Sequence, residues 1–314
     1  MYSIGIDLGG TNIAAGLVDD NFTILATANR KTQLPRPSAE IVADMAAVAR
    51  EAATNAGVSF DKIASVGVGC PGTCNGDTGI VEYSNNLRFE QVSLRDDLAA
   101  LLGCSVYVEN DANAAALGEA MAGAARGTRS SVCITLGTGV GGGTIVDGKI
   151  ISGANFAGGE LGHTVIVVDG DVCTCGRRGC WEAYASATGL INMTKRAMAE
   201  YPESLMHKLA QEMGHVSGRT AFDAMRAGDP AGERVVQRYI RYTAAGLINV
   251  VNIFQPEVLS IGGGICNEGE TLLAPLRAYL EEERYSKHSV IQTRLVRAEL
   301  GNQAGIIGAA ALGR

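Results

Sequence analysis

The chain has 314 residues, of which 46% are hydrophobic and 19% charged, and its formal net charge is −7. This balance is typical of a globular protein and excludes a disordered one. The acidic charge and the lack of a basic stripe speak against nucleic acid as a partner. No apolar run approaches the roughly 20 residues that cross a bilayer, and the first residues have no basic signal-peptide region. We therefore expect a cytoplasmic protein without a membrane partner.

The first half of the chain predicts a meander of strands followed by alternating helices and strands. Residues 2–7, 12–19 and 22–32 have strand character, and a turn containing Gly9 and Gly10 joins the first two. A helix is predicted over residues 37–56, with Ser38 as N-cap and Gly57 as stop. Further strands are predicted at 62–69 and 105–111, and a helix at 112–123. The pattern indicates an α/β protein.

Residues 130–153 repeat the plan of residues 2–31: strand, glycine turn, strand, turn and strand. Aligned, Asp7-Leu8-Gly9-Gly10-Thr11 corresponds to Thr135-Leu136-Gly137-Thr138-Gly139. This similarity predicts two related halves, and we place the boundary after residue 111. The smaller domain would span 1–111 and the larger one 112–302, while the last helix, within 303–314, is a candidate for return to the first domain.

Glycines in the two hairpin turns suit a phosphate site, because backbone N–H groups approach a phosphate closely only where no Cβ intervenes. The candidates are Gly9, Gly10, Gly137, Gly139, Gly141, Gly142 and Gly143. Tight turns without a ligand are the alternative, which two matched hairpins disfavour. Gly137-x-Gly139-x-x-Gly142 also matches the dinucleotide fingerprint, but strands rather than a helix are predicted after it. Gly263 and Gly264, after a strand-like segment, suit either a nucleotide or a flexible turn.

Two aspartates stand where predicted strands end. Asp7 precedes the first glycine turn, where a carboxylate holds Mg²⁺ through water or simply caps a turn. Asp111 lies between a strand and a helix, where a carboxylate can project into a cleft and accept the proton of the attacking hydroxyl in phosphoryl transfer. An ordinary helix N-cap is its alternative role.

The most specific motif is H-x9-C-x-C-x4-C, formed by His163, Cys173, Cys175 and Cys180. Three thiolates and one imidazole complete a tetrahedron, and such a closed set is typical of structural zinc. Glu160 and Glu182 flank the motif. If zinc binds one ring nitrogen of His163, the other can bind a substrate hydroxyl, and carboxylates gathered beside it suit a polyhydroxylated ligand.

These motifs occur in one order along the chain: residues 7–12 (DLGGTN), 109–114 (ENDANA), 136–143 (LGTGVGGG), 160–163 (ELGH) and 173–182 (CTCGRRGCWE). The chain thereby resembles the ROK family of repressors, open reading frames and kinases, most closely its bacterial glucokinases. The resemblance spans residue 3 to about 310. Residues 85–89 resemble the family's sugar-side loop, with Phe89 where many members carry Trp.

The resemblance implies an actin-like ATPase (ribonuclease H-like) fold, two α/β domains with a cleft between them. It implies ATP with Mg²⁺, structural Zn²⁺, and a sugar as the phosphoryl acceptor, with Asp111 as base. The sugar-binding residues it implies are Asn110, Asp111, Glu160, His163, Glu182, Gly72 and Asn86. The implied nucleotide and phosphate contacts are Asp7, Gly9, Gly10, Thr11, Asn12, Gly137, Thr138, Gly139, Gly141, Gly263 and Gly264. Relatives are often dimers or tetramers, so a homo-oligomer is expected.

Four functions remain open at this point. The first is an ATP-dependent glucokinase. The second is a related kinase for N-acetylmannosamine, fructose, mannose or another hexose. A sugar sensor without turnover is the third, but it has no need of a base such as Asp111. A nucleotide-cofactor oxidoreductase is the fourth, and the strand after the glycine loop argues against it.

Overall fold

The computed structural model describes residues 1–314. Its contacts divide the chain into two compact units. The first unit contains residues 1–133, 143–159 and 298–314, and the second contains 134–142 and 160–297. The helix after Asp111 thus belongs to the first unit, whereas the two-half division with its boundary after residue 111 stays a prediction. No helix combines the length and the apolar character needed to cross a membrane.

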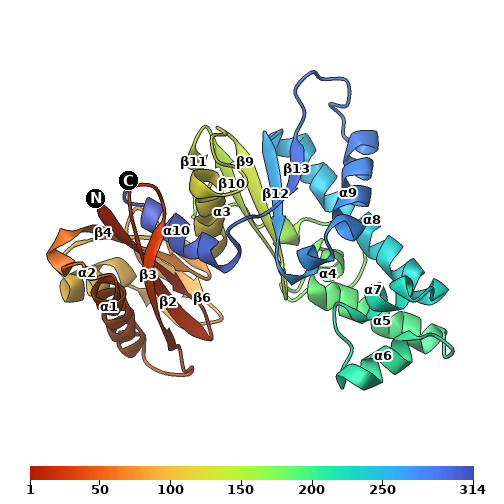
Figure 1. Cartoon of the computed structure of the whole chain (residues 1–314), viewed down its shortest axis with the longest axis horizontal. Coiled ribbons are helices and arrows are strands. Elements are labelled where there is room, and N and C mark those ends of the chain that lie inside the picture. Colours follow the sequence, from red (N-terminus) through yellow and green to blue (C-terminus); the bar gives the residue numbers. More distant parts are fainter. The chain divides into compact units, whose positions relative to one another are not determined.

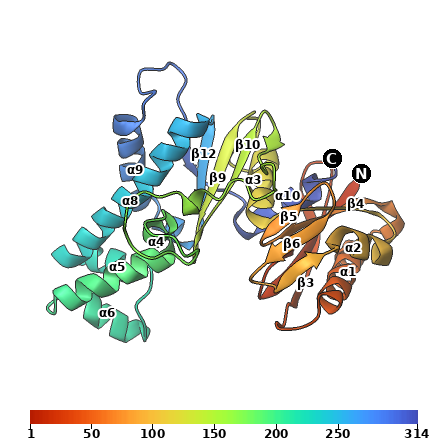
Figure 2. The ribbon, with the colours of Figure 1, turned by 180° about the vertical axis from the view of Figure 1, so that it is seen from behind.

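The first unit is built on a five-stranded sheet with the order β3-β2-β1-β4-β8 (Figure 1). Its strands are β1 (Tyr2–Leu8), β2 (Asn12–Val18), β3 (Ile24–Lys31), β4 (Ile63–Cys70) and β8 (Ser105–Asn110). The first three form the predicted antiparallel meander, and β4 and β8 extend it in parallel from β1. A small sheet, β5 (Thr73–Asn75), β6 (Ile80–Ser84) and β7 (Phe89–Val92), follows β4 (Figure 2).

Successive side chains of a strand point to opposite faces of the sheet. Helices pack on both faces of this sheet. Ile4 and Ile6 belong to the core cluster that includes residues of α1 (Ser38–Asn55) and α2 (Leu94–Leu102). On the other face, Gly5 and Gly67 admit the backbone of α10 (Ala304–Ala311), since a Cβ at either would lie 1.8 Å from a carbonyl oxygen of that helix. The C-terminal helix therefore packs on β1 and β4.

One predicted helix start is wrong. Pro37 occupies the N-cap position of α1, and Ser38 is the first helical residue and caps nothing with its side chain. Proline fixes φ near the value of a helix start and needs no N–H partner there, so this segment begins its helix without a hydroxyl cap. The predicted stop is close, because Gly57 has a φ of 68° and follows the C-cap residue Ala56.

A second sheet has the order β11-β10-β9-β12-β13, which repeats the strand order of the first. Its strands are β9 (Ser131–Leu136), β10 (Val140–Val146), β11 (Lys149–Ile150), β12 (Val258–Gly262) and β13 (Arg294–Arg297). The repeat of strand, glycine turn, strand, turn and strand that we predicted is thus present in the structure. No helix follows the glycines of residues 137–142, so the dinucleotide fingerprint lacks its required context.

The remaining helices are α3 (Asp111–Ala122), α4 (Glu182–Ala185), α5 (Ala187–Glu200), α6 (Met206–Met213), α7 (Thr220–Arg226), α8 (Pro230–Phe254) and α9 (Glu270–Glu283). The longest, α8, packs against α4, α5, α7 and α9 (Figure 1). Gly246 in its interior is explained by Trp181, since a Cβ there would lie 2.0 Å from the indole ring. This packing fixes the segment that carries Cys180 and Glu182.

Candidate active site

Asp7 and Asp111 lie at the ends of two strands that flank β4 in the first unit. Asp7 is in β1 opposite Gly69 of β4, and Asp111 follows β8, the strand on the other side of β4. A Cβ at Gly69 would lie 3.5 Å from the Cα of Asp111, so this glycine lets the start of α3 approach the strand. The topology thus brings two aspartates that are 104 positions apart to one edge of the sheet.

The surroundings of both carboxyl groups raise their pKa values. Burial, and to a smaller extent the nearby charge of Asp111, raise the pKa of Asp7 to about 6. Burial also raises the pKa of Asp111, against the lowering effect of its hydrogen bond from the Ala112 N–H at 2.9 Å. Two half-buried carboxylates that lie close together form a favourable oxygen-ligand set for a divalent cation. The residues present therefore fit magnesium.

Asn110 fixes the start of α3 and connects it to the neighbouring loop. Its Oδ1 accepts from the N–H groups of Ala112 and Asn113, at 2.9 and 3.2 Å, so Asn110 and not Asp111 is the N-cap. Its Nδ2 donates to the carbonyl oxygen of Gly72 at 3.1 Å. Gly72 has a φ of 107°, and a Cβ there would lie 2.1 Å from the carbonyl oxygen of Tyr83. Asp111 is thereby free of the capping role.

Glu109 is a buried support that the sequence motif did not single out. Its carboxylate accepts from Asn113 Nδ2 at 3.0 Å, from the Asn110 N–H at 2.8 Å and from Ser152 Oγ at 3.1 Å. These bonds satisfy a carboxylate that is 7% exposed. A Glu directly before Asn-Asp inside an apolar strand was the available signal, since buried carboxylates need such partners.

The first glycine hairpin is a closed turn between β1 and β2. The Gly9 N–H donates to the carbonyl oxygen of Asn12 at 2.9 Å, and the Thr32 hydroxyl donates to the Gly9 carbonyl oxygen at 2.6 Å. Gly10 is exposed and faces Asn86 of the predicted sugar-side loop, since a Cβ at Gly10 would lie 3.8 Å from the Asn86 Cβ. Thr11 is also exposed on this turn.

The second hairpin, between β9 and β10, lies in the second unit. Gly137 donates its N–H to the Gly139 carbonyl oxygen at 3.0 Å, and Thr138 at the tip is exposed. Gly141, Gly142 and Gly143 lie inside β10 rather than in the turn.

The last two of these glycines pack against neighbouring elements. A Cβ at Gly143 would lie 2.7 Å from the Ala112 carbonyl oxygen, and one at Gly142 would lie 3.1 Å from the side chains of Ile134 and Leu161. Close packing therefore already requires glycine at these two positions, and their role as phosphate contacts stays a prediction.

A cavity of about 290 Å³ adjoins this hairpin within the second unit, and Gly137, Thr138 and Gly264 line it. Gly263 has a φ of 96°, and a Cβ there would lie 2.3 Å from the Leu136 carbonyl oxygen, so this glycine brings β12 close to the hairpin. Sequence reasoning missed five further lining residues: Ala187, Gly218, Arg219, Ile265 and Glu268. Gly218 and Arg219 lie in a turn before α7 and the others in or at the start of helices, and none of the five belongs to a recognised motif.

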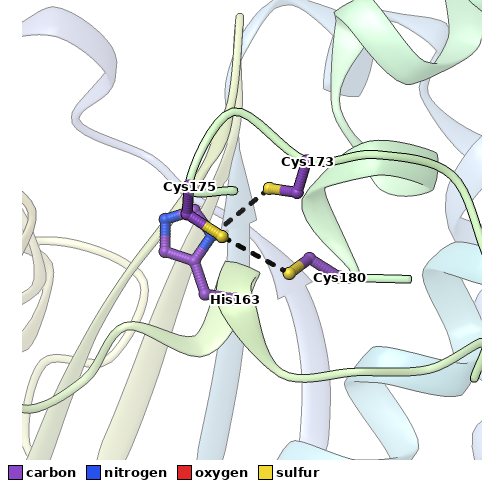
Figure 3. A group of neighbouring side chains, drawn as sticks. All are labelled: His163, Cys173, Cys175 and Cys180. Atoms are coloured by element: carbon purple, nitrogen blue, oxygen red, sulfur yellow. Dashed lines mark hydrogen bonds between the residues drawn. The ribbon is translucent and has the colours of Figure 1, made fainter. Parts of the chain in front are cut away.

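The four predicted metal ligands lie together in the second unit (Figure 3). Their ligand atoms all lie within 4.8 Å of one another. His163 Nδ1 is 3.6 Å from Cys173 Sγ, and the sulfurs of Cys175 and Cys180 are 3.7 Å apart. A zinc tetrahedron with metal–sulfur bonds of about 2.3 Å has edges of about 3.8 Å. The cluster therefore has the ligands and the dimensions of a four-coordinate metal site.

The loop that carries the cysteines is shaped by glycine and by backbone pairing. Val165 pairs with Cys180 and Val172 with Arg178 as antiparallel bridges. Gly179 has a φ of 77°, and a Cβ there would lie 1.6 Å from the carbonyl oxygen of Val167. No other residue fits at this position, which explains the glycine within the C-x4-C spacing.

Glu160 and Glu182 stand beside the cluster as expected. Glu160 Oε2 is 3.9 Å from His163 Nε2, the ring nitrogen that does not face Cys173. Glu182 Oε1 accepts from the Thr174 hydroxyl at 2.9 Å, whereas its Oε2 accepts from the Val140 N–H at 3.0 Å. Glu182 thus joins residues 165–182, which carry three of the predicted metal ligands and which we call the metal-binding loop, to the glycine hairpin. The sequence did not predict this contact.

Comparison with known proteins agrees with this arrangement. The model of the ROK family matches residues 3–314. A glucokinase of Thermotoga maritima is 37% identical over 311 residues, which cover 98% of this chain and 96% of the relative.

Among solved structures, a ROK family glucokinase from Streptomyces griseus in complex with glucose and AMPPNP has a TM-score of 0.79 at 35% identity, with 99% of both chains covered. The ROK hexokinase from Thermus thermophilus has a TM-score of 0.80 at 34% identity and covers 99% of this chain and 97% of that one.

The chain belongs to the ROK family, and its fold is the actin-like ATPase fold of these kinases. The glucokinase and the hexokinase named above match over nearly their whole length, and the site residues described above lie on the strand ends and loops of this fold.

Proposed function

We propose that the protein is an ATP-dependent glucokinase that transfers the γ-phosphoryl group of ATP to the 6-hydroxyl group of glucose. The glucokinase of Thermotoga maritima and the glucose complex from Streptomyces griseus support this choice of substrates. The observation that carries the proposal is the pair of half-buried carboxylates, Asp7 and Asp111, with raised pKa values at one edge of the first sheet. A protein that only sensed sugar would gain nothing from this costly arrangement.

Asp111 is proposed to act as the general base. Its carboxylate accepts the proton of the 6-hydroxyl as the bond from that oxygen to the γ-phosphorus forms. The bond from the γ-phosphorus to the bridging oxygen breaks, and ADP leaves with the electron pair. Burial makes Asp111 a stronger base than an exposed aspartate, because it raises the pKa of the carboxyl group.

Asp7 is proposed to hold Mg²⁺ through water. The metal would supply positive charge against the phosphate oxygens, as in other phosphoryl transferases. The nucleotide phosphates are assigned to the two hairpins, and the 290 Å³ cavity beside the second hairpin is assigned to the nucleoside. The proposed contacts are Gly9, Gly10, Thr11, Asn12, Gly137, Thr138, Gly139, Gly141, Gly263 and Gly264.

The cluster of His163, Cys173, Cys175 and Cys180 is proposed to hold a structural zinc ion. His163 would bind the metal through Nδ1 and present Nε2 to a sugar hydroxyl, beside the carboxylate of Glu160. The proposed sugar contacts are Asn110, Asp111, Glu160, His163, Glu182, Gly72 and Asn86. The cytoplasmic location and the homo-oligomeric state stay predictions.

The test is ADP release with Mg·ATP and glucose, mannose, fructose, N-acetylglucosamine or N-acetylmannosamine, with Asp111→Asn in parallel. We expect glucose to give the highest kcat/KM and Asp111→Asn to lose at least about 10²-fold in kcat. Asp96→Asn, which removes an exposed carboxylate from α2, is the matched control. A preference for another sugar would overturn the assignment of glucose as the substrate. If no sugar is turned over, the proposed kinase activity is wrong.

A further inference from the structure

A second cavity, of about 360 Å³, lies in the second unit and shares no lining residue with the nucleotide cavity. We call it the α5–α8 cavity, because Arg196 of α5 and Arg234 and Arg238 of α8 line it. Tyr184 of α4 and Asp171 of the metal-binding loop complete its wall. None of these residues has a part in the proposed phosphoryl transfer.

The cavity concentrates positive charge in a protein whose formal net charge is −7. Of its three arginines, only Arg196 has a carboxylate partner, Asp171 Oδ2 at 2.7 Å. Arg234 donates to the neutral hydroxyl of Tyr201 at 2.7 Å, and Arg238 only lies over the ring of Tyr242 at 5.9 Å. Two guanidinium groups therefore face the cavity without an anion.

Both arginines are exposed, and their spacing adds a small repulsion between them. Arg234 and Arg238 stand four residues apart on α8, where like charges repel across one helical turn. An oxyanion between them would replace this repulsion with charge-assisted hydrogen bonds, which guanidinium forks make bidentately to phosphate. The only other carboxylate in the wall, Glu200, already accepts from the Tyr201 hydroxyl at 2.8 Å.

The rest of the wall suits the carbon skeleton of a small ligand. The rings of Tyr184 and Tyr242 lie with their centroids 4.5 Å apart, and Met193 and Val235 add apolar surface. The volume of about 360 Å³ is at the lower end of small-molecule sites, which span roughly 300–1,000 Å³. A bare phosphate ion would leave most of this space unfilled.

We propose that the α5–α8 cavity binds a small phosphomonoester, such as a sugar phosphate. Its phosphoryl group lies between the guanidinium groups of Arg234 and Arg238, and its organic part packs against Tyr184 and Tyr242. This assignment does not rest on the proposed glucokinase activity, because it uses other residues and another cavity.

Occupancy of the cavity can be read by the single tryptophan of the chain. Trp181 is fully buried, and its Nε1 donates to the Tyr242 carbonyl oxygen at 3.0 Å. The cavity also adjoins the metal-binding loop, since the Asp171 N–H donates to the Tyr184 hydroxyl at 2.6 Å and the Gly179 N–H to the Asp171 carbonyl oxygen at 2.8 Å. A ligand on this wall therefore changes the surroundings of Trp181.

The experiment is a titration of the full-length, zinc-loaded protein with inorganic phosphate or glucose 6-phosphate, followed by Trp181 fluorescence and calorimetry. Saturating ADP and glucose, without Mg²⁺, occupy the proposed active site and prevent turnover. We expect saturable 1:1 binding, tighter for glucose 6-phosphate than for phosphate. The double variant Arg234→Gln/Arg238→Gln should weaken it at least about 10-fold, as expected for the loss of charged hydrogen bonds.

Arg241→Gln is the matched control, because it removes an exposed arginine of the same helix that pairs with Glu283 outside the cavity. Arg238→Lys keeps the charge but loses the fork, and we expect an intermediate affinity. Equal binding in the double variant and in the control would overturn the site, as would binding that ADP and glucose abolish. Equal affinity for inorganic phosphate and glucose 6-phosphate would overturn the assignment of a phosphomonoester as the ligand, because the site would then recognise only an anion.

Discussion

The two glycine hairpins have the same position in their sheets, but the acidic side chain beside each one comes from a different kind of segment. The first follows Asp7, which β1 itself supplies at the end of the strand. The second follows Thr135 at the aligned position, and its carboxylate comes from Glu182, whose Oε2 accepts from the Val140 N–H at 3.0 Å. The acidic residue beside the first hairpin thus lies in the strand that leads into it, whereas the one beside the second hairpin lies in the metal-binding loop.

This difference separates two tasks. Asp7 is half-buried near Asp111, which suits charge chemistry with a divalent cation. Glu182 uses both oxygens in hydrogen bonds, to Thr174 and Val140, which suits positioning. The two sheets therefore share a backbone plan, while only the first has an aspartate at the aligned position. The four predictions below test this assignment, from the largest expected effect to the smallest.

Asp7→Asn should lower kcat by about 10²–10³-fold at saturating ATP, since it removes the charge that holds the metal. Thr135→Val, at the matching place of the second hairpin, should stay within about 2-fold, because no charge is lost there. Steady-state kinetics at several Mg²⁺ concentrations measure both. Comparable losses in the two variants would remove the distinction between the hairpins.

Cys175→Ser should release the metal and raise the KM for sugar by about 10–100-fold, the usual cost of disturbing a metal site. The zinc content per chain, measured alongside the kinetics, should fall from one towards zero. Cys104→Ser is the matched control, because Cys104 lies outside the cluster. A variant that loses zinc but keeps its KM would separate the metal from sugar binding.

Glu182→Ala should raise the KM values of both sugar and ATP by about 10-fold, because it leaves the Val140 N–H without its acceptor. Glu182→Gln keeps an acceptor oxygen and should affect ATP less than the alanine variant does. Initial-rate measurements with each substrate varied in turn distinguish the two. A change in the KM for sugar alone would show that the hydrogen bond from Val140 to Glu182 does not affect ATP binding.

Asp7→Asn should also stabilise the metal-free protein. The folded-state pKa of Asp7 is raised from 3.8 to about 6, so the folded protein holds this proton more tightly than the unfolded chain does. The ionised carboxylate therefore costs stability increasingly as the pH rises from about 4 to 6, and fully above about 6.

Removing this group should increase the free energy of unfolding by about 1–3 kcal/mol at pH 8 and hardly at all at pH 4. Urea unfolding without Mg²⁺ at the two pH values measures this difference. The same gain in the free energy of unfolding at both pH values would mean that the ionised carboxylate of Asp7 does not destabilise the folded protein.

The sequence by itself determined the class of the fold and the local elements of the site. Alternating apolar residues and glycine turns specified both meanders, because these signals act within a few residues. The spacing H-x9-C-x-C-x4-C likewise specified the four-ligand cluster, since a zinc site imposes a short and recognisable pattern. The family followed from the same motifs.

Only the tertiary structure decided which distant groups meet. The bond from Val140 to Glu182, the approach of α10 to Gly5 and Gly67, and the cavity between α5 and α8 join residues that no local pattern relates. Glycine was ambiguous for the same reason: Gly143 and Gly137 look alike in sequence, yet one packs against α3 and the other lines a cavity. Periodicity and motifs report on neighbours along the chain, whereas burial and charge partners depend on which elements pack together.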